Sequence, residues 1–410
     1  MFKTNRGIEV FFYDWIRFGL INIIFVAIWG TMMRYNMLHE LPFFQQQNLL
    51  HAHSHFAFGG WISHFIYVGL SYIILKNTNS AKIKIYNRII IANLISAYGM
   101  LIAFSIQGYK AVSITFSTMS IVVAVIFALY YIRDSKFLPN DFAAKPWTLA
   151  SIFFNAFSIF GPFSLALLMA KKITTPTYNL SSIYYYLHFQ YNGWFFFASM
   201  AMFIALLSNR IKNLNRDCWI LAACTVITYL LSVLILKVKL PLWAYLLTVL
   251  AAWAQLIIWF GILIKIIKYW KNYKIKLEKG ILILGAIVLV STSLKFILQA
   301  LSVFPILNDL AYQYRPFVIA YLHLVLIGIF SLFIYAYSLK QSIISYSFEN
   351  KFYISLFVIG FLINEFSLVL EGVGWANKIN VFYLNEFLLL ASLLLLYSGW
   401  KIYLLSRAKQ

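Results

Sequence analysis

The chain has 410 residues, of which 62% are hydrophobic and 11% are charged, and its mean hydropathy is +0.81. A water-soluble domain of this size cannot bury so much apolar surface, so the composition indicates an integral membrane protein. The formal net charge of +21 would also suit a nucleic-acid-binding protein, and the positions of the charges decide between the two classes.

Apolar runs long enough to cross about 30 Å of hydrocarbon recur along the whole chain. They predict about twelve transmembrane helices, near residues 9–32, 52–75, 88–106, 111–132, 147–170, 183–208, 217–236, 241–264, 280–303, 316–338, 352–373 and 381–400. No Gly/Ser/Pro-rich linker separates them, so we expect a single all-α membrane domain over residues 1–410. The first run is too long for a signal-peptide core and lacks a small-residue cleavage site, so we expect it to be retained. Cys218 and Cys224 lie in one apolar span and are expected to serve packing.

The basic residues orient the predicted spans. With the N-terminus inside, 23 Lys/Arg fall in the termini and inner loops, 8 in outer loops and 2 (Arg17 and Lys295) within spans. By the positive-inside rule both termini are cytoplasmic, as expected for a multi-pass protein of the cell inner (cytoplasmic) membrane. The densest basic stretch, Lys265 through Lys279, is predicted to be an inner loop that meets anionic lipid headgroups, and we expect no nucleic-acid partner.

Histidines are the most informative polar residues, because an ionisable group within a membrane span is a functional candidate by default. The sequence places His39 in the first outer loop, His51, His53, His55 and His64 on the second span, His188 on the sixth and His323 on the tenth. The second, sixth and tenth spans all enter from outside, so His53, His188 and His323 lie at similar depth in the outer half. Such a layer suits a metal or heme held between helices. The alternative is three unconnected interfacial histidines.

The second span presents its histidines on two faces. At about 100° per residue, His51 and His55 lie within roughly 40° of one another, while His53 points about 160° away from either. His64 returns to within about 20° of the His53 face, roughly 16 Å deeper. The Gly59-Gly60 pair allows close approach of a neighbouring helix or a flat macrocycle, although paired glycines more often serve helix packing alone.

Three segments resemble subunit I of the heme-copper oxidase and nitric oxide reductase superfamily. These are Leu50-His51-Ala52-His53-Ser54-His55, Leu187-His188-Phe189-Gln190-Tyr191-Asn192-Gly193-Trp194 and Tyr321-Leu322-His323-Leu324-Val325-Leu326. The resemblance implies a twelve-helix bundle with both termini inside. It also implies a low-spin heme bridged by histidines of the second and tenth helices, and a high-spin heme that faces a second metal.

Residue by residue, the resemblance assigns heme iron to His53 and His323, with His51 and His55 as alternatives to His53. His188 matches the histidine that binds the non-heme metal in nitric oxide reductases. Two departures stand against a complete active site. Tyr321 occupies the position of the high-spin heme ligand, and the seventh span, which ends at Lys237-Val238-Lys239, carries none of the expected adjacent histidines. His188 is then a remnant second-metal ligand, and a second heme, copper or iron is not expected.

Charges near the span ends extend this interpretation. Arg34, Arg315 and Lys378 lie at outer ends, where heme propionates would point, but each also suits an ordinary interfacial anchor. Four further ionisable groups lie within or near spans and are candidates for proton relays or for mutual neutralisation. These are Lys295, Glu365, Glu371 and Glu386.

The leading functional hypothesis is a heme-binding redox membrane protein, oxidoreductase-like but with a degenerate second metal site and no assigned catalytic residue. It would serve respiratory electron transfer or a larger membrane complex, with other membrane subunits and an electron partner at the outer face. The heme would be b-type, because the sequence has no Cys-x-x-Cys-His motif. One alternative is a transporter without heme, whose outer pocket is lined by the histidines, Gln190, Asn192 and Tyr321. Another is a diheme four-helix cytochrome, suggested by the spacing of His51 and His64, but no other helix carries the two histidines it needs.

Overall fold

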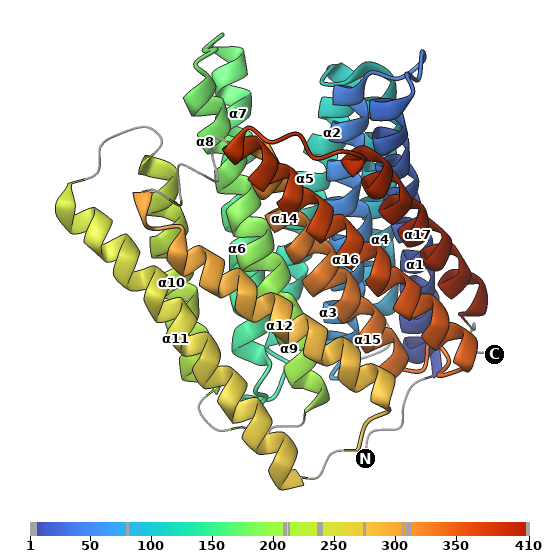
Figure 1. Ribbon diagram of the computed structural model, residues 1–410. Helices are drawn as coiled ribbons and strands as arrows, with labels where there is room; N and C mark the ends of the chain where they lie inside the picture. Colours follow the sequence, from blue (N-terminus) through green and yellow to red (C-terminus); the bar gives the residue numbers. More distant parts are fainter. Residues whose placement is uncertain are drawn as a thin grey trace. The chain divides into compact units, whose positions relative to one another are not determined.

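The computed structural model describes residues 6–78, 82–207, 211, 214–235, 241–273, 276–305, 307 and 314–406. The regular elements of these residues are helices (Figure 1). The only β-type pairing among them is an isolated bridge between Ile344 and Ser406. The described chain therefore has the all-α architecture that its composition predicts.

The chain divides into two compact units, of which unit 1 contains residues 1–127, 278–289 and 310–410 and unit 2 contains residues 128–277 and 290–309. Unit 1 holds α1 (Arg6–Leu38), α2 (Gln46–Phe56), η1 (Ala57–Ile62), α3 (Ser63–Leu75), α4 (Ile83–Gln107), α14 (Arg315–His323), η4 (Leu324–Ser331), α15 (Leu332–Lys340), α16 (Phe348–Asn377) and α17 (Leu384–Leu405). Unit 2 holds α6 (Lys145–Ser158), α7 (Phe160–Ala170), α8 (Pro176–His188), η3 (Phe189–Phe195), α9 (Phe196–Leu206), α10 (Leu214–Ile235) and α11 (Leu242–Tyr273). Helices α5 (Ala111–Ser135) and α12 (Lys279–Leu301) contribute to both.

Among the described residues, 11 helical runs are long and apolar enough to cross a membrane. Each of them coincides with one of the twelve predicted spans. The remaining prediction, residues 183–208, falls on the continuous run of α8, η3 and α9, whose polar residues lower its hydropathy. The chain is therefore a multi-pass helical membrane protein, and the predicted single domain of subunit I type stays a prediction.

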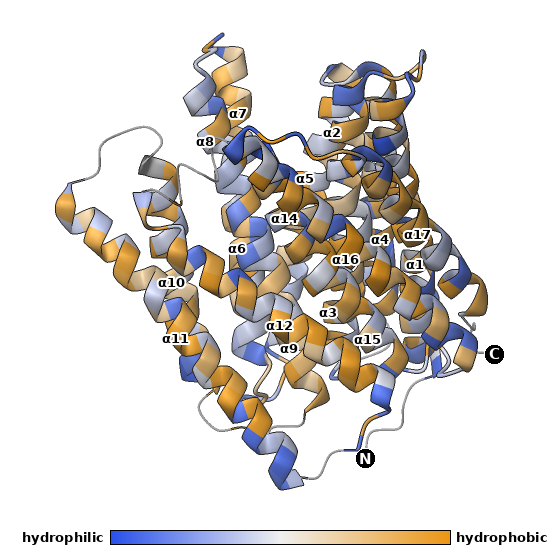
Figure 2. Cartoon of the chain, in the orientation of Figure 1, coloured by the Kyte–Doolittle hydropathy of each residue, from blue (hydrophilic) through white to orange (hydrophobic). Residues whose placement is uncertain are grey.

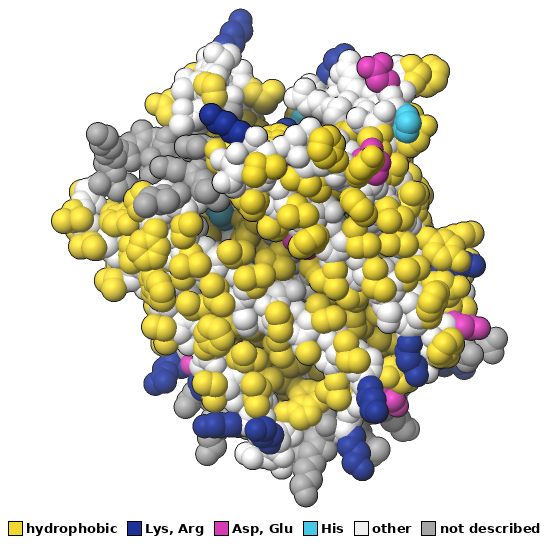
Figure 3. All heavy atoms as spheres, viewed as in Figure 1, with side chains coloured by type: hydrophobic (Ala, Val, Ile, Leu, Met, Phe, Trp, Pro, Cys, Tyr) yellow, Lys and Arg dark blue, Asp and Glu magenta, His cyan; other side chains and the backbone are white. Residues whose placement is uncertain are grey.

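The helix surfaces are those of a protein in contact with lipid. Along α11, Leu250 and Ile257 are each 68% exposed, which is favourable where hydrocarbon and not water surrounds the helix. Figure 2 shows apolar residues along most of this helix and a hydrophilic last turn. Hydrophobic side chains also cover most of the face seen in Figure 3.

The predicted inner loop at Lys265 through Lys279 is wrong over its first half. Helix α11 continues to Tyr273, so Lys265 and Lys271 are helical, and Lys265 forms an ion pair with Asp217 near the start of α10. The physical reason is that lysine ends an apolar run without ending a helix, because its propensity is high and its long stem lies along apolar surface.

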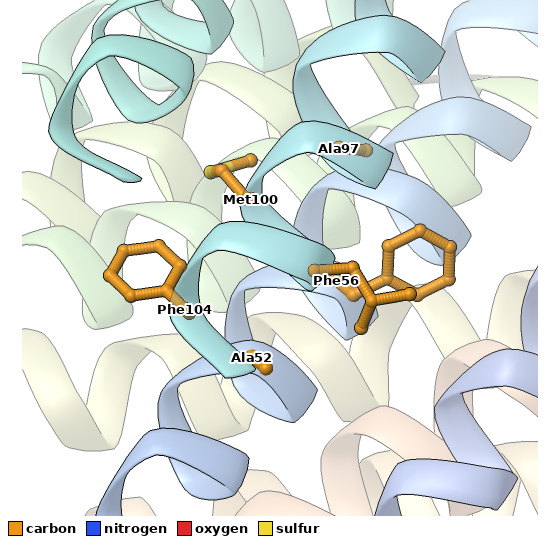
Figure 4. Close-up of a cluster of buried hydrophobic side chains, with 6 residues drawn as sticks. Ala52, Phe56, Ala97, Met100 and Phe104 are labelled. Atoms are coloured by element: carbon orange, nitrogen blue, oxygen red, sulfur yellow. The ribbon is translucent and has the colours of Figure 1, made fainter. Parts of the chain in front are cut away.

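Small residues bring α2 and α4 together in unit 1. Ala52 and Phe56 of α2 and Ala97, Met100 and Phe104 of α4 belong to one buried cluster (Figure 4). Because alanine adds only a methyl group, the two backbones approach closely, as is common between membrane helices. This contact fixes α2, which carries His51, His53 and His55, against α4.

Three described spans change from α-helix to π-helix within two residues after a candidate histidine. The π-helical segments are η1, η3 and η4, which follow the histidines of α2, α8 and α14. Each contains a glycine five residues after a histidine: Gly60 after His55, Gly193 after His188 and Gly328 after His323. The three spans that carry the candidate histidines are thus also those with unusual backbone, and π-helical bulges are frequent at functional sites.

Candidate functional site

His53 faces α1, and its ring orientation is fixed by the backbone. Its Nδ1 lies 3.0 Å from the carbonyl oxygen of Val26, which accepts a hydrogen bond when Nδ1 carries the proton. That tautomer leaves the lone pair on Nε2, the arrangement that metal-ligating histidines commonly have. A Cβ at Gly30 would come within 3.2 Å of His53 Cε1, so the absence of a side chain at Gly30 makes room for the imidazole.

His51 and His55 face the other way, toward α4 and the turn that follows it. The His55 ring stacks on Phe104 with 4.5 Å between centroids, and its Nε2 lies 2.9 Å from the Tyr109 hydroxyl. His51 contacts the same Tyr109 ring edge-on at 4.6 Å. The division of the second span into two histidine faces is thus as predicted, and of these three histidines His53 is the one that points toward α1.

His323 ends α14, and its Nδ1 is buried with no hydrogen-bond partner among the described residues. The ring interacts electrostatically with His53 and with Arg34, so these three side chains lie near one another within unit 1. Tyr321 precedes His323 by two residues and therefore projects about 160° away around the helix. The structure brings together the two histidines that the resemblance pairs.

Two asparagines satisfy backbone groups that the π-helical turn of η1 exposes. Asn22 of α1 donates to the carbonyl oxygen of Gly60 at 2.5 Å, and Asn93 of α4 donates to that of Gly59 at 3.1 Å. The Tyr98 hydroxyl in turn donates to Asn22 Oδ1 at 2.7 Å. Because a buried carbonyl without a partner is costly in a membrane, these bonds stabilise the altered turn below the histidines.

A further bond ties η1 to η4. Trp61 Nε1 donates to Ser331 Oγ at 3.0 Å, and Ser331 donates to the carbonyl oxygen of Leu326 at 2.9 Å. The two π-helical segments that follow His53 and His323 are therefore linked directly. This linkage fixes the second and tenth spans relative to each other about two turns from the histidines.

Of the three basic candidates, Arg34 is the one near the histidines. It interacts electrostatically with both His53 and Glu371. Arg315, at the start of α14, and Lys378, in left-handed conformation at the end of α16 with φ of 57°, are exposed. Glu371 has Arg34 as its charged neighbour, Glu365 accepts a hydrogen bond from Asn364 at 3.1 Å, and Glu386 is exposed.

His64 is fully buried deeper in the same span. Its Nε2 lies 2.9 Å from the carbonyl oxygen of Trp15, and a Cβ at Gly19 would come within 3.2 Å of its ring. Gly19 and Gly30 are eleven residues apart on α1, as His64 and His53 are on the facing span. The two glycines thus accommodate the two histidines in register, but among the described residues no second histidine contacts His64.

His188 in unit 2 is surrounded by aromatic and amide groups. The ring stacks on Tyr229 of α10 at 4.6 Å and 17°. Its Nδ1 lies 2.9 Å from the Tyr191 hydroxyl and 3.4 Å from the Asn192 amide. The resemblance implies histidines for the second metal on the seventh span. On that span, the residue stacked on His188 is Tyr229. The end of this span at Lys237-Val238-Lys239 lies outside the described residues.

Within the described part of the chain, no three His, Cys, Asp or Glu side chains are grouped as a metal site. A six-coordinate heme needs only two imidazoles from the protein. His53, whose Nδ1 is bonded to Val26, and His323, whose buried Nδ1 has no partner among the described residues, fit that requirement.

No protein-family model and no curated protein matches this chain.

Sequence reasoning did not identify the groups that support these histidines. Asn22, Trp61, Ser331 and Tyr229 are single polar or aromatic residues in apolar spans, and nothing in their local sequence distinguishes them from packing residues. The recurring glycine five residues after a histidine is the one signal that could have indicated the three modified turns.

Proposed function

We propose that the chain is a heme-binding redox protein of the membrane, in which His53 and His323 hold one low-spin heme b. The observation that carries the proposal is the pairing of these two histidines within unit 1. They come from different spans, and the π-helical segments that follow them along the chain are joined by the hydrogen bond from Trp61 to Ser331. The proposal agrees with the resemblance to subunit I of the heme-copper oxidase superfamily.

The chain's own groups prepare His53 for this role. The Val26 carbonyl keeps the proton on Nδ1 and fixes the orientation of the ring, which leaves the Nε2 lone pair for a metal. Arg34 supplies a guanidinium near both histidines, where it can accept a carboxylate of the cofactor as a bidentate partner. A heme held between two imidazoles transfers single electrons and has no open coordination position.

We further infer that the second metal site is degenerate, so the protein does not reduce oxygen as a heme-copper oxidase does. His188 is packed by Tyr229, and Tyr321 replaces the high-spin heme ligand. The remaining function is electron transfer in a respiratory chain or a larger membrane complex.

The termini are proposed to be cytoplasmic in the inner membrane, with the heme and its electron partner toward the outer face. A reporter fused at Gln45 should then be outside and one at Lys271 inside, and the reverse would invert the assignment.

An absorption spectrum of the purified full-length protein tests the proposal. In the oxidised and then dithionite-reduced states, we expect a sharp α band of b-type heme and about one heme per chain by pyridine hemochrome assay. A preparation that is folded by circular dichroism but remains colourless after reconstitution with hemin would contradict it.

A further inference from the structure

Lys295 is an unusual residue of unit 2, because it is a buried lysine on a membrane helix. It is 2% exposed on α12, and its Nζ lies 3.9 Å from the ring centre of Phe296 and 5.1 Å from that of Phe196. Aromatic faces compensate part of the cost of removing an ammonium from water, but a buried charge normally also has an ionic partner.

No carboxylate of the described residues provides that partner. Among the acidic residues of unit 2 that the structure describes, Asp134 pairs with Arg133 and Asp217 pairs with Lys265, while Asp141 is exposed. None lies within 4.0 Å of Lys295 Nζ. The charge of Lys295 is therefore not balanced by the described part of the protein.

The neighbours of Lys295 are hydrogen-bonding groups. Gln299 lies one turn further along the same face of α12, and its amide donates to Asn192 Oδ1 at 3.4 Å. The Asn192 amide reaches His188, which interacts electrostatically with Lys295. Tyr229, stacked on His188, is 3% exposed, and its hydroxyl has no hydrogen-bond partner among the described residues.

We propose that Lys295 and Tyr229, with Asn192 and His188, bind a small monovalent inorganic anion inside unit 2. A single anion would balance the charge of the ammonium and would accept a hydrogen bond from the Tyr229 hydroxyl, which has no other partner among the described residues. The stacking of Tyr229 on His188 positions that hydroxyl. This site is independent of the heme proposal, because all its residues belong to unit 2.

Chloride binding to the purified full-length protein in detergent tests this site. Chloride replaces gluconate at constant ionic strength, while the ³⁵Cl NMR linewidth and the unfolding temperature are followed. For the unaltered protein we expect a saturable excess linewidth and an unfolding temperature that rises with chloride, since a ligand bound to the folded state stabilises it.

Variants distinguish the effect of removing the Lys295 charge from an effect on folding. Lys295→Met should abolish both chloride effects, whereas Lys171→Met, which removes an exposed lysine of unit 2, should leave them intact. Tyr229→Phe keeps the ring and should weaken binding about tenfold. Lys295→Arg keeps the charge and should retain binding if Lys295→Met proves unstable.

The proposal fails if the unaltered protein shows no difference between chloride and gluconate. It also fails if Lys295→Met, or Tyr229→Phe where the former does not fold, binds chloride as the unaltered protein does.

Discussion

His53 in unit 1 and His188 in unit 2 are each followed on the same span by a π-helical segment, yet their surroundings differ. His53 is held by a backbone carbonyl and interacts with a second histidine, His323, on another span. His188 is covered by the Tyr229 ring and contacts a hydroxyl and an amide. The modified turn alone therefore does not define a ligand site. What neighbouring helices present to the histidine decides whether it can bind a metal.

The largest effect expected from this comparison is on heme content. His53→Ala and His323→Ala should each reduce the low-spin α band to below about a tenth of its original intensity, because one imidazole does not hold a six-coordinate heme. His188→Ala should leave the band unchanged. The α band is measured on protein matched for amount and for monodispersity in size-exclusion chromatography. Equal loss of the band in all three variants would remove the proposed difference between the two regions.

The second expected result concerns metal at His188. Because Tyr229 occupies the neighbouring position on α10, we expect no stoichiometric copper or non-heme iron and no oxygen consumption with a quinol or cytochrome donor. Elemental analysis and an oxygen electrode provide the measurements. A complete second site would be indicated by about one copper per chain that His188→Ala removes.

The modified turn of unit 2 should be sensitive to packing. A Cβ at Gly193 would lie 2.5 Å from Phe154, whereas a Cβ at Gly261 of α11 meets nothing within 4 Å. Gly193→Ala should thus lower the free energy of unfolding by about 1–3 kcal/mol. Gly261→Ala should be neutral or slightly stabilising, since alanine favours helix. Both are followed by SDS-induced unfolding in mixed micelles, and equal values would show that Phe154 can move aside.

The smallest effect is expected where a side chain supports the modified turn of unit 1. Asn22→Ala removes the bond to the Gly60 carbonyl and should cost about 0.5–2 kcal/mol, in the range of polar interactions between membrane helices. Asn377→Ala, which removes a bond from an exposed side chain to Val373, should change stability by less than about 0.5 kcal/mol. The same unfolding assay compares them. A shifted α band in Asn22→Ala would show, in addition, that the turn positions His53.

Much of this arrangement follows from the sequence, and the remainder depends on contacts between distant segments. Apolar run length predicts the spans, and a period of 3.6 residues predicts that His51 and His55 share a face that excludes His53. Apart from the glycine five residues after a histidine, the local sequence does not indicate the π-helical turns, and in η1 the exposed carbonyls are satisfied by Asn22 and Asn93 from other helices. Likewise, nothing in the sequence of α10 indicates that Tyr229 would be the residue stacked on His188.

The axial ligation of the heme is the central claim, and electron paramagnetic resonance of the oxidised protein tests it most directly. We predict the low-spin ferric signal of a heme with two imidazole ligands, accounting for about one heme per chain. In His323→Ala reconstituted with hemin, that signal should give way to a high-spin one. A high-spin signal from the unaltered protein, or a low-spin signal that persists in His323→Ala, would contradict the pairing of His53 with His323.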